Sequence, residues 1–232
     1  MVKILVCHLK EERIARKVEE LYPYLSRDRI EQLRKLHQPD DRFRSAIGDL
    51  LIRFAFSNVY GQTLEWDSLK RTAYGKPYLP DYPSFHFNTS HAGDWIACAI
   101  HHAPVGVDVE EIKPIQFDFA KGVFTENEYK RVVEHPDPLS AFYQTWTAKE
   151  SVVKADGRGL SYPLSSFEVA FQQDGRVNML NDEREYRSRT YSFQEEYVLT
   201  VCAEQVSQLP DRFIEIEYDS LIQMEENTCL FK

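Results

Sequence analysis

The sequence predicts an α+β fold, because segments with the alternation of strands are mixed along the chain with segments of helical periodicity. The valines of 105–109 alternate with other residues, which is typical of a strand buried on one face. An apolar stripe at helical spacing follows Pro39, and a second helical segment spans 146–154. The length of 232 residues favours one large domain or two small ones. The hydrophobic content of 43% excludes a disordered chain.

The first hundred residues are expected to form a sheet with helices. Ser26 suits the start of a short helix that runs to Leu36, and Gly61 suits the end of the longer helix after Pro39. Residues 90–94 are expected to join two antiparallel strands. The predicted segments are a strand at 2–8, a charged helical segment at 11–21, and strands at 85–89 and 95–100.

A polar break at 101–104 predicts a boundary between an N-terminal half, 1–103, and a C-terminal half, 104–232. In the second half, Thr125 and Glu128 have capping-box spacing, and Gly157 suits the end of the long helix. The other predicted segments are a strand at 105–110, a loop or short helix at 111–124, strands at 167–171, 177–180, 186–193, 197–203 and 213–216, and a tail at 227–232.

The charge is divided unequally between these halves. The whole chain has a net charge of −9, which argues against a nucleic-acid-binding protein. Residues 1–103 carry a net +2 and residues 104–232 a net −11. We therefore expect an anionic ligand to be bound chiefly by the first half and a metal ion by the second.

Cysteine content and hydropathy predict a cytoplasmic protein. The four cysteines, Cys7, Cys98, Cys202 and Cys229, lack metal-binding spacing and are expected to be buried thiols. No apolar run approaches membrane-spanning length, so no membrane partner is expected. The short apolar stretch at 2–8 predicts a strand rather than a secretory signal.

Two acidic segments about forty residues apart are the candidate site. Asp108 and Glu110 share one face of the predicted strand, and Glu150 and Lys154 share one face of the predicted helix. If the helix lies across the strand, three carboxylates converge, and a divalent cation such as Mg²⁺ would offset their repulsion. Taken singly, each pattern has a simpler interpretation, as a solvated strand face or as an ordinary ion pair on a helix surface.

Together these segments resemble the Sfp-type 4'-phosphopantetheinyl transferases. That family has Gly-(Val/Ile)-Asp-x-Glu, Phe-(Ser/Thr)-x-x-Glu and Trp-x-x-Lys-Glu-Ser-x-x-Lys followed by Gly-x-Gly-Leu. The chain matches these motifs in order at 106–110, 124–128, 146–154 and 157–160. The resemblance extends upstream to Gly75-Lys76-Pro77 and to Phe87-Asn88-Thr89-Ser90-His91.

The resemblance implies two similar α+β halves about a pseudo-twofold axis, with the ligand between them. It implies an enzyme that transfers the 4'-phosphopantetheine group of coenzyme A to a serine of an acyl or peptidyl carrier protein and releases adenosine 3',5'-bisphosphate. Lys149-Glu150-Ser151 is similar to the branch that serves peptide and polyketide synthetases. A chain with two halves need not oligomerise to complete its site, so a monomer is expected.

The resemblance also implies roles for individual residues. Asp108, Glu110 and Glu150 would hold Mg²⁺, and Glu150 would also activate the serine. Lys154 would offset charge on the leaving phosphate. The residues that would contact coenzyme A are Arg44, Gly75, Lys76, Ser90, His91 and Lys154.

Neighbouring residues have less specific interpretations. Arg42 and Arg53 are expected to lie on a solvated helix flank. In the family the residue that corresponds to Glu128 often lies close to the metal-binding strand. Glu128 is therefore expected at most to contact the metal ligands, and not the metal ion itself. Three residues of the 111–124 segment belong either to the core or to an exposed surface that binds the carrier protein: Ile115, Phe117 and Phe119.

Two other functions are compatible with the sequence. Carboxylates with a lysine also serve Mg²⁺-dependent nucleases, although those sites usually place Glu-x-Lys on a strand. A non-catalytic module that binds coenzyme A or a carrier protein is the other alternative, although no residue expected for the chemistry is missing.

Overall fold

The computed structural model describes residues 1–9, 12, 16–180 and 186–229. Part of the helical segment predicted at 11–21 therefore lies outside the described residues, and Val18–Tyr24 is a 3-10 helix, η1. The end of the predicted tail, 230–232, also lies outside them. Within these ranges, no helix has the length and apolar character that crossing a membrane requires.

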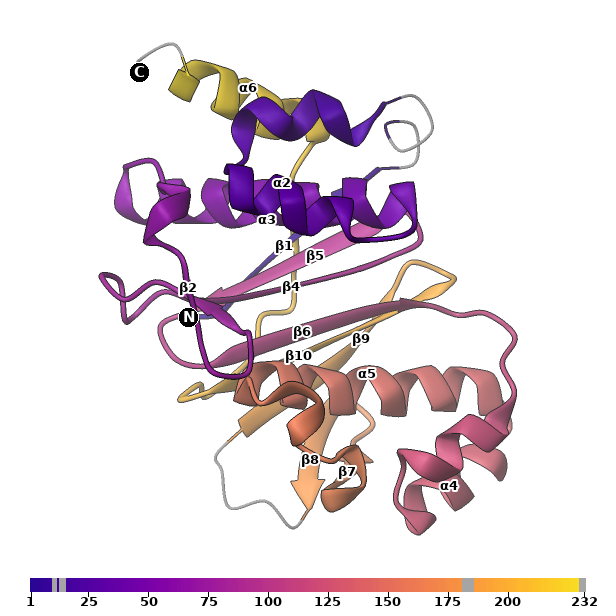
Figure 1. Cartoon of the computed structure of the whole chain (residues 1–232). Helices are drawn as coiled ribbons and strands as arrows, with labels where there is room; N and C mark the ends of the chain where they lie inside the picture. The colour runs from indigo at the N-terminus through magenta and orange to yellow at the C-terminus, as the bar shows by residue number, and fades with distance from the viewer. Residues whose placement is uncertain (10–11, 13–15, 181–185, 230–232) are drawn as a thin grey trace.

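The first half contributes three strands to a four-stranded sheet that is covered on one face by helices (Figure 1), and the fourth strand, β11 (Ile214–Glu215), comes from the end of the chain. The strand order is β11-β1-β5-β4, in which β11 pairs with β1 in parallel and the other pairs are antiparallel. Leu50, Leu51 and Phe56 of α3 are buried against this sheet. The elements are β1 (Lys3–His8), α2 (Arg27–Arg34), α3 (Pro39–Tyr60), η2 (Trp66–Ser68), β2 (Lys70–Arg71), β3 (Pro77–Tyr78), β4 (His86–Ala92) and β5 (Trp95–His101).

The second half is a five-stranded antiparallel sheet with the order β6-β10-β9-β8-β7. Val152 and Val153 of α5 are buried in a cluster with residues of this sheet. The elements are β6 (Val105–Glu111), η3 (Phe117–Gly122), α4 (Glu126–Val133), α5 (Pro138–Asp156), η4 (Gly159–Ser161), η5 (Leu164–Ser166), β7 (Glu168–Phe171), β8 (Arg176–Leu180), β9 (Tyr186–Phe193), β10 (Tyr197–Glu204), β11 (Ile214–Glu215) and α6 (Tyr218–Cys229).

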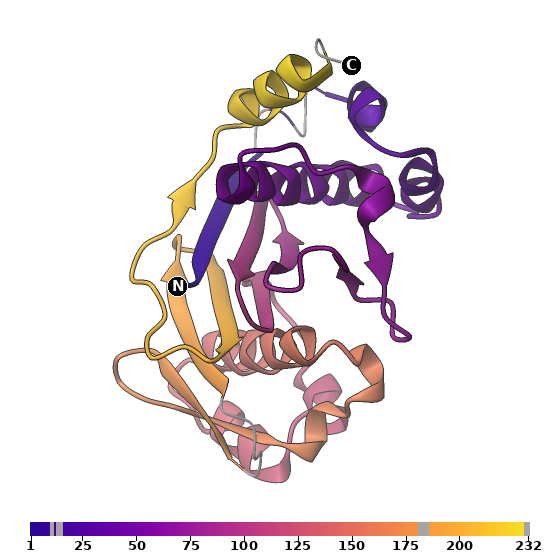
Figure 2. The ribbon, with the colours of Figure 1, turned by 90° about the vertical axis from the view of Figure 1, so that its left-hand side faces the viewer.

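The two sheets pack against each other between the two long helices (Figures 1 and 2). Val6 from β1, Val107 from β6 and Val201 from β10 belong to the cluster that the sheets share. Each half is thus a sheet with one long helix on its outer face, which confirms the predicted α+β class with two similar halves. Cys7, Cys98 and Cys202 are buried free thiols, as predicted, and the side chain of Cys229 lies outside the described part.

The end of the chain returns to the first half. Strand β11 pairs with β1, and α6 packs against α3 (Figure 2). The predicted tail is therefore wrong for 227–229, which continue α6. The expectation of a solvated Arg53 is also wrong, because Arg53 is 5% exposed and lies 2.6 Å from the buried carboxylate of Glu225. The boundary between residues 103 and 104 stays a prediction.

Gly106 brings β6 unusually close to α5. A Cβ atom at this position would lie 2.0 Å from the carbonyl oxygen of Ser151 and 2.4 Å from the backbone nitrogen of Ala155. Both atoms belong to the helix backbone, so neither can move aside cheaply. Glycine in this motif therefore sets the distance between the strand and the helix that carry the acidic residues.

Candidate functional site

The acidic residues lie where α5 crosses β6. Alternation on β6 directs Val107 and Val109 into the shared core and Asp108 and Glu110 toward α5. Glu150 and Lys154 are one turn apart on α5 and interact electrostatically with Asp108. The strand and helix therefore bring the four predicted residues together, as the spacing indicated.

Asp108, Lys154 and Ser90 form a hydrogen-bonded triangle across the two halves. The ammonium Nζ of Lys154 lies 2.6 Å from Asp108 Oδ1 and 3.0 Å from Ser90 Oγ. Ser90 Oγ donates to the same carboxylate oxygen at 2.9 Å. Lys154 thus pairs with Asp108 of the strand, and the helix-surface pair with Glu150 is not the contact observed. Asp108 is only 3% exposed, so its neighbours in the fold replace water as its polar partners.

Glu110 and Glu150 sit in surroundings that disfavour their charged forms. Burial and the neighbouring Asp108 raise the pKa of Glu110 to about 7, although Trp146 Nε1 donates a hydrogen bond to Glu110 Oε1 at 3.1 Å. Burial raises the pKa of Glu150 also, and Asp108 adds to this effect while Lys154 opposes it. Three carboxylates close enough to repel one another therefore share a single nearby ammonium group.

The carboxylates of Asp108, Glu110 and Glu150 are not arranged around one shared metal position. Within the described ranges, no three side chains of Asp, Glu, His or Cys are arranged to hold one metal ion. Lys154 occupies one oxygen of Asp108, and the other, Oδ2, is buried and accepts no hydrogen bond from the described residues. A buried carboxylate oxygen without a donor is a site at which a cation would be stabilised.

His91 and Arg44 lie together on the first half. Burial, with a further contribution from Arg44, lowers the pKa of His91 to about 4, so its imidazole is neutral at pH 7. Arg44 donates to the carbonyl oxygen of Gly93 at 3.0 Å and to Asp41 Oδ1 at 2.5 Å. The interaction of His91 with Lys154 links this pair to the acidic residues.

Gly75 and Lys76 lie on the short β2–β3 hairpin beside the C-terminal end of α5. Gly75 has φ +87°, which favours glycine, and forms the exposed turn. The ammonium group of Lys76 points away from that turn and donates to the carbonyl oxygens of Val105, Lys154 and Ala155. The structure therefore joins Lys76 to the second half through backbone atoms.

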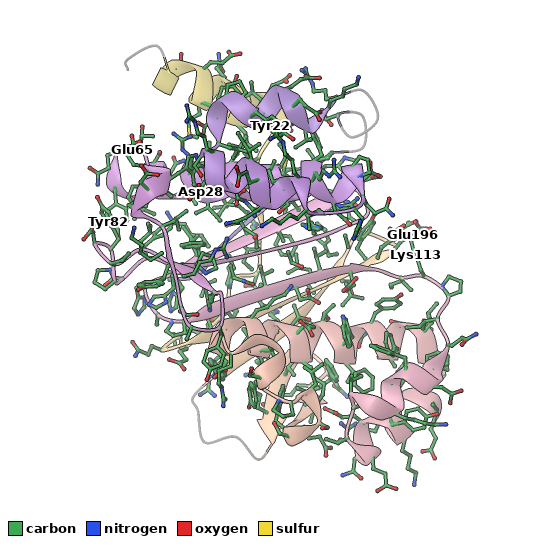
Figure 3. All side chains as sticks on the ribbon, in the orientation of Figure 1. Tyr22, Asp28, Glu65, Tyr82, Lys113 and Glu196 are labelled. Atoms are coloured by element: carbon green, nitrogen blue, oxygen red, sulfur yellow. The ribbon has the colours of Figure 1, made fainter. Side chains whose placement is uncertain are left out.

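A cleft of about 600 Å³ is lined by α2, α3, η2, β2 and residues 87–89 of β4. Arg29, Gln32 and Arg71 line it, as does Asp28 of α2, which is labelled in Figure 3. Asn88 and Thr89 of β4 lead from this cleft to Ser90. The lining contains three basic side chains (Arg29, Lys70 and Arg71) and three acidic ones (Asp28, Asp49 and Asp67), and Arg29 is paired with Asp49.

Sequence reasoning missed the pair of Lys149 with Glu128. Both side chains are fully buried, and Lys149 Nζ lies 2.7 Å from the Glu128 carboxylate and 2.6 Å from the carbonyl oxygen of Phe167. Glu128 also accepts from the backbone nitrogens of Thr125 and Val169. Its observed contacts join α4, α5 and β7 and do not reach β6. The sequence offered one indication of this pair: each of two neighbouring motifs contains one of the two oppositely charged residues, Glu128 in 124–128 and Lys149 in 146–154.

Asn88 is a second residue without a predicted role. Strands β4 and β6 are the edges of their sheets and face each other. Asn88 Oδ1 accepts a hydrogen bond from Val107 N at 2.8 Å, so a side chain satisfies a backbone donor of the edge strand. This contact fixes Ser90, two residues further along β4, beside Asp108.

Two models of known protein families match the chain. The model described as "4'-phosphopantetheinyl transferase superfamily" matches residues 104–202, and the model described as "4'-phosphopantetheinyl transferase, N-terminal" matches residues 14–103.

Bacillus relatives match the chain over most of its length. A 4'-phosphopantetheinyl transferase from Bacillus subtilis is 40% identical over 206 residues, covering 87% of this chain and 92% of the relative. The transferase Sfp of Bacillus subtilis (strain 168) is 34% identical over 208 residues, covering 88% and 92%. The transferase psf-1 of Bacillus pumilus is 33% identical over 198 residues, covering 84% and 85%. The resemblance read from the motifs is confirmed, and the chain belongs to the Sfp-like 4'-phosphopantetheinyl transferases.

Proposed function

We propose that this protein transfers the 4'-phosphopantetheine group of coenzyme A to a serine hydroxyl of a carrier protein. The observation that carries the proposal is the 40% identity to a 4'-phosphopantetheinyl transferase over nearly its whole length. Three of the motif residues, Ser90, Asp108 and Lys154, meet across the two halves, which supports a site between them. Similarity to Sfp and the Lys149-Glu150-Ser151 sequence favour carrier proteins of peptide or polyketide synthetases.

Mg²⁺ fits the donor set of the site. Asp108, Glu110 and Glu150 would hold it, because a hard cation prefers carboxylate oxygens and Asp108 Oδ2 is buried without a donor. Bound Mg²⁺ would neutralise the diphosphate of coenzyme A and fix its orientation. The carboxylates would have to draw together, and Lys154 would have to share Asp108 with the ion.

The chain's own residues supply the remaining chemistry. The serine oxygen forms a bond to the phosphorus that carries pantetheine, and the bond from that phosphorus to the bridging oxygen breaks. Glu150, directly or through a water, takes the serine proton, and its raised pKa moves it toward the range of an effective base. Lys154 stabilises the departing adenosine 3',5'-bisphosphate and can donate a proton to it.

Intact mass of an apo-carrier protein, measured after incubation with coenzyme A and Mg²⁺, tests the proposal. A mass increase equal to 4'-phosphopantetheine is expected, and chelation of Mg²⁺ should abolish it. Cleavage of DNA or RNA without this mass change would favour the nuclease alternative. Binding of coenzyme A or the carrier without any product would favour the non-catalytic module.

Asp108→Asn is expected to lower Mg²⁺-dependent transfer at least about 100-fold. Losing a partner outside the ligand set already costs 10- to 100-fold at many metal sites, and Asp108 is proposed as a ligand itself. Because Asp108 is buried and paired with Lys154, a thermal melt must accompany the rate measurement. Asp219→Asn at an exposed position of α6 is the matched control. Near-normal turnover with an unchanged response to Mg²⁺ would refute the assignment.

Phe119 is the proposed contact for a carrier protein beside the site. Its side chain is 52% exposed, and its ring lies 5.5 Å from that of Trp146. Trp146 in turn donates to Glu110. Ile115 and Phe117 instead pack partly against the cluster around Phe142, so Phe119 is the member of the predicted surface that is free to contact a partner.

Phe119→Ser is expected to raise KM for the carrier protein about fivefold or more and to leave KM for coenzyme A within about twofold. Truncating an aromatic contact at an interface often costs more than about 1 kcal/mol, which corresponds to this change. Steady-state kinetics with each substrate varied in turn would measure it. Exposed Phe171→Ser on β7 controls for loss of a surface ring. Parallel increases in both constants, or unfolding, would contradict a docking role.

A further inference from the structure

We propose that Lys76 is a positioning residue that fixes the C-terminal end of α5, and with it Lys154, rather than a group that binds a phosphate. The inference rests on the proposed function, because Lys154 matters only if the site performs the transfer. It departs from the contact with coenzyme A that the family resemblance implies for Lys76, which for an ammonium group would be a contact with phosphate.

The hydrogen bonds of Lys76 use the full capacity of its ammonium group. Nζ donates to the carbonyl oxygens of Lys154 at 2.6 Å, Ala155 at 2.8 Å and Val105 at 3.3 Å. An ammonium group has three donors and no acceptor, so three carbonyls saturate it. In this arrangement no donor is left for a phosphate oxygen.

The position of these carbonyls gives the contact its effect. Carbonyl groups in the last turn of a helix lack partners within the helix and carry partial negative charge, so a cation there stabilises the end of the helix. The third carbonyl belongs to Val105 at the start of β6. Lys76, from the first half, therefore ties together the strand and the helix that hold Asp108 and Lys154.

The surroundings of the Lys76 side chain are shaped for this contact. A Cβ atom at Gly157 would lie 2.7 Å from Lys76 Cδ, so the glycine that ends α5 leaves room for the lysine stem. Gly157 also has φ +85° and its nitrogen donates to Val153 O at 2.9 Å, which closes the helix. Burial lowers the pKa of Lys76 to about 8, so removal from water opposes the charge and the carbonyl oxygens replace the lost hydration.

Residues of the first half contact Lys154 at both its backbone and its side chain. Its carbonyl oxygen accepts from Lys76, and its ammonium group contacts Ser90 and Asp108. Misplacement of a reacting group by about 1 Å can cost about 100-fold in rate. Loss of the Lys76 contact should therefore appear in kcat, although Lys76 itself touches no reacting atom.

Lys76→Met tests the inference, because it keeps most of the stem and removes the ammonium group. We expect kcat to fall roughly 10- to 100-fold and the Kd for coenzyme A, measured by calorimetry, to change less than about threefold. Lys3→Met, at an exposed position on β1, removes the same charge and should change neither quantity. A Kd at least tenfold weaker with kcat retained would overturn the inference in favour of a phosphate contact.

Hydrogen exchange gives a second readout that needs no turnover. In Lys76→Met the backbone amides of Ala155, Asp156 and Gly157 should exchange at least tenfold faster, while those near the middle of α5 keep their protection. Unchanged exchange in this turn would also overturn the inference. If the wild-type protein transfers nothing to a carrier, the proposed function fails, whereas the exchange result still decides whether Lys76 holds the helix.

Discussion

Glu150→Gln should lower kcat by roughly 10²- to 10⁴-fold while the affinity for coenzyme A changes only modestly at saturating Mg²⁺. Glutamine keeps the size and one oxygen of the side chain but cannot take a proton from serine at neutral pH, and a general base contributes about this much to rate. Coenzyme A would retain its other contacts, and Asp108 and Glu110 would still be present for the ion. Pre-steady-state transfer rates and calorimetric binding would separate the two quantities.

The same variant distinguishes the two roles assigned to Glu150. Recovery of kcat at high Mg²⁺ would show that the residue is only a ligand. Preserved kcat with a large loss of coenzyme A affinity would contradict both roles. Glu134→Gln, at the residue that follows α4, is the matched control, because its side chain is 65% exposed.

Lys149→Met should produce the largest loss of stability, about 3–5 kcal/mol of the free energy of unfolding. The change leaves the carboxylate of Glu128 buried without its cation, and the energetic cost of an unpaired buried charge is large. Urea denaturation followed by circular dichroism would measure it. The cost is a substantial part of the 5–15 kcal/mol typical of native proteins.

A second substitution shows whether the unpaired charge is the cause. Glu128→Gln in the Lys149→Met background removes the charge and keeps one oxygen, which can accept from one of the two backbone nitrogens, Thr125 N or Val169 N, that donate to the two carboxylate oxygens of Glu128. The double variant should recover at least half of the lost stability. If it is no more stable than Lys149→Met alone, packing of the lysine stem rather than charge dominates.

Local patterns in the sequence were sufficient to predict the strand and helix of the candidate site. The alternation of 105–109 identified the face of β6 that carries Asp108, and the four-residue spacing of Glu150 and Lys154 placed both on one face of α5. These predictions succeeded because side-chain direction in a regular element depends on near neighbours in sequence. That the helix lies across the strand was a condition of the prediction, which the local patterns did not establish, and the contact of α5 with β6 fulfils it.

Contacts between distant segments could not be predicted in this way. Arg53 has a position typical of a helix surface. It is buried in the structure, where it pairs with Glu225 of α6, a helix far along the chain. A solvated strand face was one interpretation of the pattern that contains Asp108, yet Asp108 is buried, and Ser90 from β4 and Lys154 from α5 donate to one of its oxygens. The Lys76 contact is equally non-local, since its acceptors are backbone carbonyls that no residue type identifies.

The return of the chain to its first sheet has a consequence for synthesis on the ribosome. Strand β11 and helix α6 cover the edge of β1 and pack against α3, but they are translated after the whole second sheet. The first half therefore emerges with one strand edge unpaired and part of its apolar surface exposed, and it stays so until residues 214–229 leave the exit tunnel. Translation order thus leaves the earliest segment to be completed last.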